Sequence, residues 1–242
     1  MYAIQIKDLC KNYGQIIAVD NFTLEIRQGE IFSLLGINGA GKTTLIKMLS
    51  CITKPTSGDA LILGSSITSD SEKIKEYIGV SPQQSAIAPG LTVKENLQLI
   101  AGIHGYNRKE QDKKIKEMAE RFGLSEILHR RASTLSGGWQ RRLSIAMALI
   151  NEPKILFLDE PTLGLDVIAR SELWSVIRSL KGRSTVILTT HYMEEAEALS
   201  DRIGIMKNGK LLTTGTADDM KTRTGTDKFE AAFVELVKEV EG

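Results

Sequence analysis

Cysteine is scarce in this sequence, and the spacings that would give cysteines a structural role are missing. Cys10 and Cys51 are the two cysteines of the chain, and no C-x-x-C pair occurs. Two thiols without such spacing argue against a disulfide framework and against a structural zinc site. We therefore expect reduced, mostly buried cysteines in a cytosolic protein.

Charge of one sign and long apolar runs are also lacking. The net charge is +1, which gives no electrostatic reason to expect nucleic acid or an anionic membrane surface as a partner. No window approaches the roughly 18 apolar residues that a membrane span needs. The N-terminus has no basic segment followed by an apolar stretch, so we expect no signal peptide. Any role at a membrane is expected to be exercised through another chain.

No internal repeat, low-complexity segment or linker divides the 242 residues. The hydrophobic content of 42% and charged content of 25% are ordinary for a globular protein and supply ample material for a core. We predict one domain, residues 1–242, in which a helical block at about residues 93–151 is inserted in an α/β core.

Periodicity predicts the remaining elements. Alternation of apolar and polar residues indicates strands at Ala3–Ile6 and Phe22–Ile26. Apolar residues at helical spacing indicate a helix at Arg108–Phe122. Asn208-Gly209 predicts a hairpin with a type I′ turn. The amphipathic tail, 227–241, carries Phe229, Phe233, Leu236 and Val240 at helical spacing and is expected to pack on the domain.

The most specific motif lies between an apolar run, Ile31–Leu35, and a helical run, Thr43–Leu49. Its octapeptide, GINGAGKT, matches G-x-x-x-x-G-K-[ST], the phosphate-cradling loop. Glycines let successive N–H groups face a phosphate, and the helix adds the positive end of its dipole. We expect Lys42 to reach the outer phosphates and the Thr43 hydroxyl to ligate Mg²⁺. The predicted nucleotide-binding residues of this phosphate loop are Gly36, Ile37, Asn38, Gly39, Ala40, Gly41, Lys42 and Thr43.

Two carboxylates follow a second apolar run. Residues Ile155–Leu158 suit a central parallel strand buried on both faces, and Asp159 and Glu160 emerge at its end. Burying two acids is costly without a purpose. We predict that Asp159 holds Mg²⁺ and that Glu160 orients and polarises the attacking water. Adjacent side chains point to opposite sides of a strand, so the two roles are separate.

A further strand, Thr185–Thr190, follows a helical segment, Ala169–Leu180, and completes a βαβ crossover. Glu160 and His191 then lie at the carboxyl ends of parallel strands, where open α/β sheets bind ligands. A lone histidine after a strand is more often a surface residue, but this position favours contact with the terminal phosphate. The other histidines lack such a setting and are expected at the surface: His104 and His129.

Three further features stay open on the residues alone. The turn 136–138 precedes a predicted helix, Arg141–Ile150, and forms a second helix N-terminus that suits an anion, although Ser and Gly precede many helices. Tyr13 is either a turn aromatic, which the residues alone favour, or a ring that stacks on a base. Gln83 is either an ordinary loop amide or a metal ligand that moves with its loop.

Taken in order, the phosphate loop, Gln83, LSGGWQ, ILFLDE and His191 resemble an ATP-binding-cassette (ABC) nucleotide-binding domain over essentially the whole length. The LSGG stretch is the most specific element, because other phosphate-loop ATPases lack it. The resemblance implies an α/β phosphate-loop NTPase fold with a central, mainly parallel sheet. It also implies an N-terminal antiparallel β subdomain and a helical insertion that carries LSGG. The stretch TTHYMEEAEALSDRIGIMKNGK looks most like the cassettes of drug- and lipid-type exporters whose permease is a separate chain.

The resemblance implies two cassettes, identical or diverged, paired head to tail around two ATP molecules. Each ATP would touch the phosphate loop and Thr44 of one cassette, and the signature turn of the other: Ser136, Gly137 and Gly138. By the same resemblance Tyr13 stacks on adenine, Asp166 couples the two sites, and Gln83 contacts Mg²⁺ and relays closure to the permease. Trp139 departs from the glutamine of many members, which puts a side-chain contact from position 139 to ribose in doubt.

The function expected is that of the ATP-hydrolysing motor of an export transporter, held at the cytoplasmic face of the membrane by its permease. Its cofactors would be ATP and Mg²⁺, and no nucleic acid is expected. The alternatives are an importer cassette, a soluble ABC-type ATPase acting on nucleic acid or protein complexes, and a nucleotide sensor without catalysis. The absence of a basic patch argues against the soluble ATPase, and Glu160 and His191 argue against the sensor.

Overall fold

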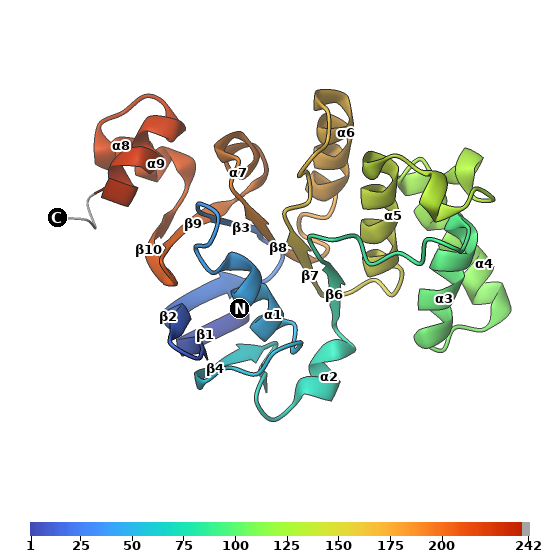
Figure 1. Ribbon diagram of the computed structural model, residues 1–242, viewed down its shortest axis with the longest axis horizontal. Helices are drawn as coiled ribbons and strands as arrows, with labels where there is room; N and C mark the ends of the chain where they lie inside the picture. Colours follow the sequence, from blue (N-terminus) through green and yellow to red (C-terminus); the bar gives the residue numbers. More distant parts are fainter. Residues whose placement is uncertain (239–242) are drawn as a thin grey trace.

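The larger of two β-sheets forms the centre of the fold in the computed structural model, which describes residues 1–238 (Figure 1). Its strand order is β10-β9-β3-β8-β7-β6, and its neighbours run parallel except at the edge, where β10 pairs antiparallel with β9. The strands are β3 (Ile31–Leu35), β6 (Ile78–Ser81), β7 (Ile155–Asp159), β8 (Thr185–Thr190), β9 (Arg202–Lys207) and β10 (Lys210–Gly215). The predicted central, mainly parallel sheet is confirmed.

The smaller sheet is antiparallel, in the order β2-β1-β4-β5. Its strands are β1 (Tyr2–Tyr13), β2 (Ile16–Arg27), β4 (Ser57–Ile62) and β5 (Ser65–Ser66). The first two run far beyond the predicted Ala3–Ile6 and Phe22–Ile26. Register shifts between Ile6 and Lys11 interrupt the alternation of the side chains, so the sequence pattern identified only the regular part of each strand. The expected N-terminal antiparallel subdomain is otherwise confirmed.

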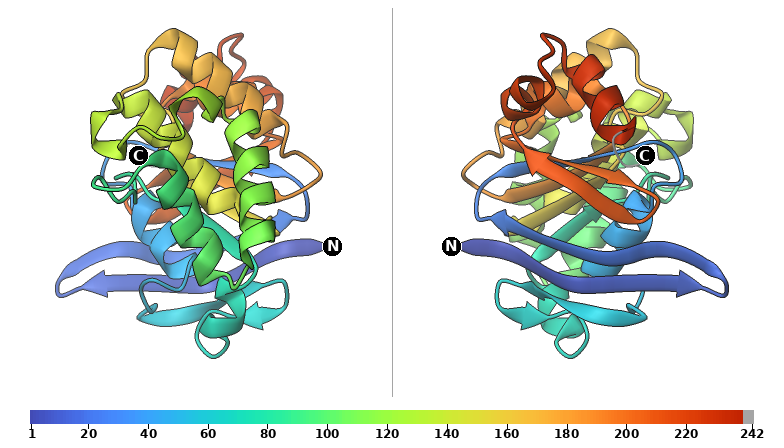
Figure 2. Two further views of the ribbon diagram at one scale, coloured as in Figure 1. Left: turned by 90° about the vertical axis from the view of Figure 1, so that its right-hand side faces the viewer. Right: turned by 90° about the vertical axis from the view of Figure 1, so that its left-hand side faces the viewer.

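Three helices form a block at one end of the molecule (Figures 1 and 2). They are α3 (Val93–Ile103), α4 (Arg108–Arg121) and α5 (Gly137–Leu149), with short 3₁₀ turns at Ser125–Ile127 and Ala132–Thr134. Helices α3 and α4 begin with capping boxes. The side chains of Thr92 and Asn107 each accept a hydrogen bond from the backbone N–H of the glutamate three residues later, and that glutamate's side chain accepts one from the N-cap backbone N–H. The apolar face predicted for the Arg108–Phe122 helix is buried, as expected: Ile115, Met118, Ala119 and Phe122.

Helix α5 begins at Gly137, so the predicted start at Arg141 is wrong by four positions. Glycine has a low helix propensity, and the two glycines therefore read as a loop. In the structure they form the first turn of the helix, and the Gln140 N–H donates to the Ser136 carbonyl at 3.0 Å.

Alternate residues of β7 enter two different cores. Ile155 and Phe157 pack with helix α1 (Lys42–Leu49), which lies between the two sheets, whereas Leu156 and Leu158 pack with α5 and with α6 (Val167–Arg178). Every residue of β7 is buried. The prediction of a central strand covered on both faces is confirmed.

The remaining helices are α2 (Ser71–Lys75), α7 (Met193–Leu199), α8 (Ala217–Thr224) and α9 (Phe229–Lys238). Between β9 and β10, Asn208 and Gly209 have φ of 49° and 80°, as the predicted type I′ turn requires. Helix α9 packs through buried Phe229, Phe233 and Leu236 on α7 and β9, which confirms the predicted packing of the tail. Val240, the fourth residue of that pattern, lies outside the described residues.

Three expectations about exposure can be compared with the fold. Cys10 and Cys51 are free thiols, as expected, and both are half-buried. Cys10 lies in the irregular part of β1, and Cys51 lies just after α1. His104 and His129 are exposed, as expected. Within residues 1–238, none of the helices combines the length and the apolar character that crossing a bilayer requires.

Candidate nucleotide site

The phosphate loop connects β3 to α1, and two of its glycines are sterically required. A Cβ at Gly36 would lie 2.3 Å from the Met206 carbonyl oxygen, and one at Gly41 would lie 2.2 Å from the Ala18 carbonyl oxygen. Gly41 also has φ of 104°, and Gly39 has φ of 82°, conformations that glycine adopts without strain. The backbone of β9 and β2 therefore packs closely against the loop at these two glycines.

Lys42 is the first residue of α1, and its side chain is buried. Its Nζ donates to the carbonyl oxygens of Gly36 at 2.8 Å and Ile37 at 3.1 Å, and it lies 3.9 Å from Glu160 Oε1. Burial lowers the pKa of Lys42, and the carboxylates of Glu160 and Asp159 act in the opposite direction. The ammonium group thus stands inside the loop, where a phosphate group would be held.

The Thr43 hydroxyl and the Asp159 carboxylate lie side by side, although 116 positions separate them in the chain. Thr43 Oγ1 donates to Asp159 Oδ1 at 3.2 Å, and Thr189 Oγ1 donates to the same oxygen at 2.5 Å. Asp159 is 3% exposed. The two residues predicted to bind Mg²⁺, Thr43 and Asp159, therefore lie within hydrogen-bonding distance of each other.

Glu160 follows Asp159 in a left-handed conformation, with φ of 49°. Its N–H donates to the carbonyl and hydroxyl oxygens of Thr189. Its carboxylate lies close to two other predicted site residues, His191 and Gln83. His191 Nδ1 lies 3.3 Å from Oε1, and Gln83 Nε2 donates to Oε2 at 3.4 Å. The structure therefore brings Lys42, Gln83, Glu160 and His191 together at the carboxyl edge of the large sheet.

A cavity of about 350 Å³ lies over the phosphate loop, and both Gln83 and Glu160 line it. Strand β2 adds Ile16, Ile17 and Ala18 to its lining, and seven further predicted nucleotide-binding residues also line it: Asn38, Gly39, Ala40, Gly41, Lys42, Thr43 and Thr44. Tyr13 lies outside this lining among the described residues; the residue is 48% exposed, and Lys11 Nζ lies 5.1 Å from its ring centroid. The exposed Ile16 and Ile17 were not predicted from the sequence, because a pair of isoleucines at the start of a strand carries no nucleotide signal.

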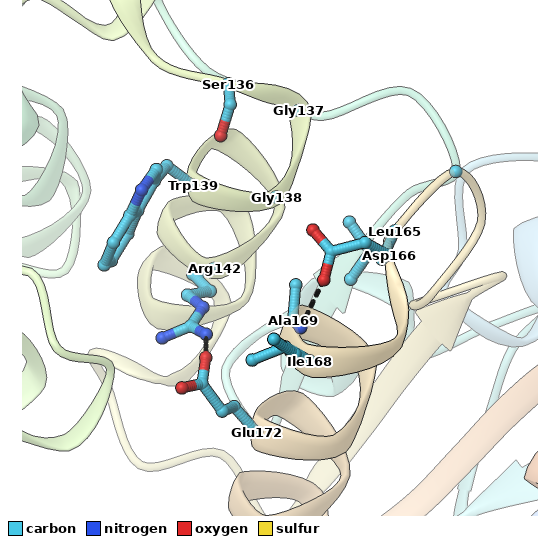
Figure 3. Close-up of a pocket in the computed structure, with 11 residues that line it drawn as sticks. Ser136, Gly137, Gly138, Trp139, Arg142, Leu165, Asp166, Ile168, Ala169 and Glu172 are labelled. Atoms are coloured by element: carbon cyan, nitrogen blue, oxygen red, sulfur yellow. Dashed lines mark hydrogen bonds and ion pairs between the residues drawn. The ribbon is translucent and has the colours of Figure 1, made fainter.

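A second cavity, of about 460 Å³, lies against the N-terminal turn of α5 (Figure 3). The turn 136–138 lines it together with Trp139, Arg142 and, from the start of α6, Asp166. The Asp166 side chain caps α6 by accepting the Ala169 N–H at 2.9 Å. Within the described chain, the two cavities share no lining residue. The predicted second anion-binding turn therefore opens into a space of its own.

The side chains of Trp139 and Gln140 both have contacts with other residues of the described chain. The Arg142 guanidinium lies 4.8 Å from the Trp139 ring centroid and forms an ion pair with Glu172. Gln140 Nε2 donates to the carbonyl oxygens of Ala132 and Leu135. The Gln140 amide nitrogen is therefore hydrogen-bonded to the segment that precedes α5.

Comparison with known proteins identifies the family to which the chain belongs. The family described as ABC transporter matches residues 19–163, which span the phosphate loop, the signature turn and both carboxylates. The chain is a member of the ABC transporter family.

Two relatives of this ABC cassette are described by the drugs of their systems. A probable multidrug ABC transporter ATP-binding protein of Escherichia coli is 41% identical over 97% of this chain and 41% of its own length. A daunorubicin resistance ATP-binding protein of Streptomyces coeruleorubidus is 38% identical over 96% of this chain and 74% of its own length. The chain thus spans about two fifths of the first relative and about three quarters of the second.

Solved structures give the same fold. One described as an ATP-binding subunit of an ABC transporter superposes with a TM-score of 0.87 at 28% identity, covering 97% of this chain and 99% of that one. Another, described as the dimeric, post-hydrolysis state of an ATP-binding cassette bound to ADP and phosphate, has a TM-score of 0.82 at 29% identity. That alignment covers 88% of this chain and 98% of the other. The fold class expected from the sequence is confirmed.

Proposed function

We propose that this ABC cassette hydrolyses ATP and so drives transport, as an export motor, through a separate membrane permease. The observation that carries the proposal is the position of Glu160. This buried carboxylate lies at the rim of the cavity over the phosphate loop, within 4 Å of both Lys42 Nζ and His191 Nδ1. The multidrug-transporter description of one relative and the daunorubicin-resistance description of another support export.

In the proposed complex the phosphate loop holds the ATP phosphates through its backbone N–H groups, and Lys42 pairs with the outer phosphates. The oxygens of Thr43 and Asp159, 3.2 Å apart, fit Mg²⁺, which takes few protein ligands and completes its shell with phosphate and water. Gln83 would add a third oxygen. The ion would neutralise charge that develops on the transferred phosphoryl group.

Hydrolysis needs a water oriented in line with the terminal phosphate. Glu160 is suited to this because its carboxylate is buried, accepts a hydrogen bond from Gln83 and lies 3.3 Å from His191 Nδ1. Glu160 orients the water and accepts its proton, and His191 contacts the terminal phosphate. The adjacent Asp159 remains with Thr43 and Thr189, so each carboxylate has one role.

We further propose that a second cassette completes the site. The N–H groups at Ser136, Gly137 and Gly138 would bind the partner's ATP, since a helix N-terminus attracts anions. Asp166 lines the same cavity and would couple the two sites. Tyr13, exposed at the end of β1, would stack on adenine beside Ile16 and Ile17. Residues 1–242 would then form one domain, attached to the cytoplasmic face of the membrane by the permease.

A charge introduced at the signature turn tests the paired site. A Cβ at Gly137 would meet none of the described atoms within 4 Å, so Gly137→Asp should fold and still bind ATP at its own phosphate loop. Its carboxylate would repel a partner's triphosphate. In sedimentation velocity, ATP should drive self-association of Glu160→Gln, and the double variant with Gly137→Asp should stay monomeric. Gly90→Asp, at another open glycine, is the matched control. Equal association of the Gly137→Asp variant would refute the shared site.

A further inference from the structure

Arg141 is a buried, charged residue to which the mechanism above gives no role. It lies in the second turn of α5 and is 4% exposed. Its donors reach the backbone of two other segments: Nε donates to the Pro161 carbonyl at 2.9 Å, Nη2 to the Asp159 carbonyl at 2.6 Å, and Nη1 to the Pro82 carbonyl. The guanidinium thus connects α5 to the ends of β6 and β7.

Two of these carbonyls flank Glu160. The residue between them has φ of 49°, a conformation that side chains other than glycine seldom adopt and that persists only where surrounding contacts enforce it. Thr189 accepts a hydrogen bond from the Glu160 N–H. Arg141 donates to the carbonyls of Asp159 and Pro161, the residues on either side of Glu160. The orientation of the Glu160 carboxylate therefore depends on the hydrogen bonds of the Arg141 guanidinium.

The third carbonyl belongs to the residue before Gln83. Gln83 in turn contacts the Glu160 carboxylate at 3.4 Å, so one guanidinium positions both the carboxylate and the amide that meets it. A lysine ammonium is a single point on a flexible stem and cannot reproduce this planar set of donors. Burial lowers the pKa of Arg141 to about 10, with Asp159, Glu195 and Glu160 opposing the shift, so the group stays charged at neutral pH.

We propose that Arg141 is a positioning residue for ATP hydrolysis, because it holds the strained Glu160 turn and the Gln83 loop in the arrangement that aims the water. The inference rests on the proposed ATPase activity. It predicts that Arg141 affects the chemical step and leaves ATP binding at the phosphate loop unchanged.

The test compares ATP hydrolysis and ATP affinity in the full chain carrying Arg141→Lys. We expect kcat to fall about 10- to 100-fold, the range for a reacting group displaced by roughly 1 Å, with an unchanged Kd for ATP by calorimetric titration. Arg178→Lys is the matched control. It also removes two guanidinium hydrogen bonds to a backbone carbonyl, that of Ala198, but on the exposed surface between α6 and α7, and its kcat should be unchanged.

A second pair of variants separates positioning from a general structural role. In the Glu160→Gln background, Arg141→Lys should cause little further loss of radiolabelled phosphate release, because the group that it positions is already absent. An equal fold-loss in both backgrounds would overturn the proposal, as would an unchanged kcat in Arg141→Lys. Arg141→Gln, which keeps amide donors without a charge, decides the matter if Arg141→Lys does not fold. A wild-type rate in Glu160→Gln alone would instead refute the proposed function.

Discussion

Replacing Gly41 with alanine should distort the phosphate loop more than any other single-methyl change within it. Gly41 is the N-cap of α1, with φ of 104° and ψ of 0°. Its added Cβ would lie 2.2 Å from the Ala18 carbonyl oxygen and 2.9 Å from the Met206 side chain. The first contact is with backbone, so a side-chain rotation cannot relieve it.

The magnitude follows from two costs. Holding an L-residue at positive φ costs about 1–2 kcal/mol, and forcing an extra carbon into packed structure costs about 1–3 kcal/mol. Their sum, about 2–5 kcal/mol, must appear either as lost stability or as a displaced loop with weaker phosphate binding. Since about 1.4 kcal/mol is tenfold in an equilibrium constant, the corresponding loss of ATP affinity is about 30-fold or more.

Calorimetric ATP titration and thermal unfolding, measured together, test this reasoning. Gly39→Ala is the matched control, because Gly39 also has positive φ but its Cβ would meet none of the described atoms within 4 Å. It should show the conformational cost alone. Gly90→Ala, at an open glycine outside the left-handed region, should show neither. Equal effects of Gly41→Ala and Gly39→Ala, or wild-type binding and stability in Gly41→Ala, would refute the steric argument.

Three further outcomes are expected. Lys42→Ala should weaken ATP binding about tenfold or more in the same titration, because a charge-assisted bond contributes about 1.5–3 kcal/mol; unchanged affinity would contradict the role of Lys42. Thr43→Val, which keeps shape but loses the hydroxyl beside Asp159, should raise the Mg²⁺ concentration for half-maximal hydrolysis roughly tenfold, and an unchanged Mg²⁺ titration would count against that ligand pair. Glu195 is fully buried, and desolvation raises its pKa above the ordinary 4.5. The folded chain then binds the proton more tightly, so this group's contribution to stability falls as pH rises above 4.5. Glu195→Gln should weaken that pH dependence in thermal unfolding, and an identical pH profile would contradict it.

Local patterns were enough to predict the phosphate loop and the strands beside it. GINGAGKT encodes its own turn, because Gly39 and Gly41 have positive φ, which glycine adopts without strain. The apolar run of β7 and the Asn208-Gly209 turn are likewise local signals. These features depend on residues close in sequence, and the sequence therefore specifies them directly.

What the sequence concealed depends on contacts between distant segments. Thr189 is an ordinary strand residue until the parallel pairing of β7 and β8 places it against Asp159 and Glu160. Arg141 reads as one arginine of a helix, and only the packing of α5 shows that it grips the carbonyls around Glu160. The early start of α5 and the irregular ends of β1 were missed because tertiary contacts override glycine propensity and alternation there.

ATP turnover by Glu160→Gln tests the central claim most directly. Steady-state phosphate release and ATP binding should be measured on the same preparations of the full chain and the variant. The amide keeps the shape of the carboxylate but cannot accept the proton of water, so the rate should fall about 10²- to 10⁴-fold while ATP affinity is retained. Phosphate release at the wild-type rate would show that Glu160 does not activate the water, and the account of this site as the hydrolytic centre of an ABC motor would be wrong.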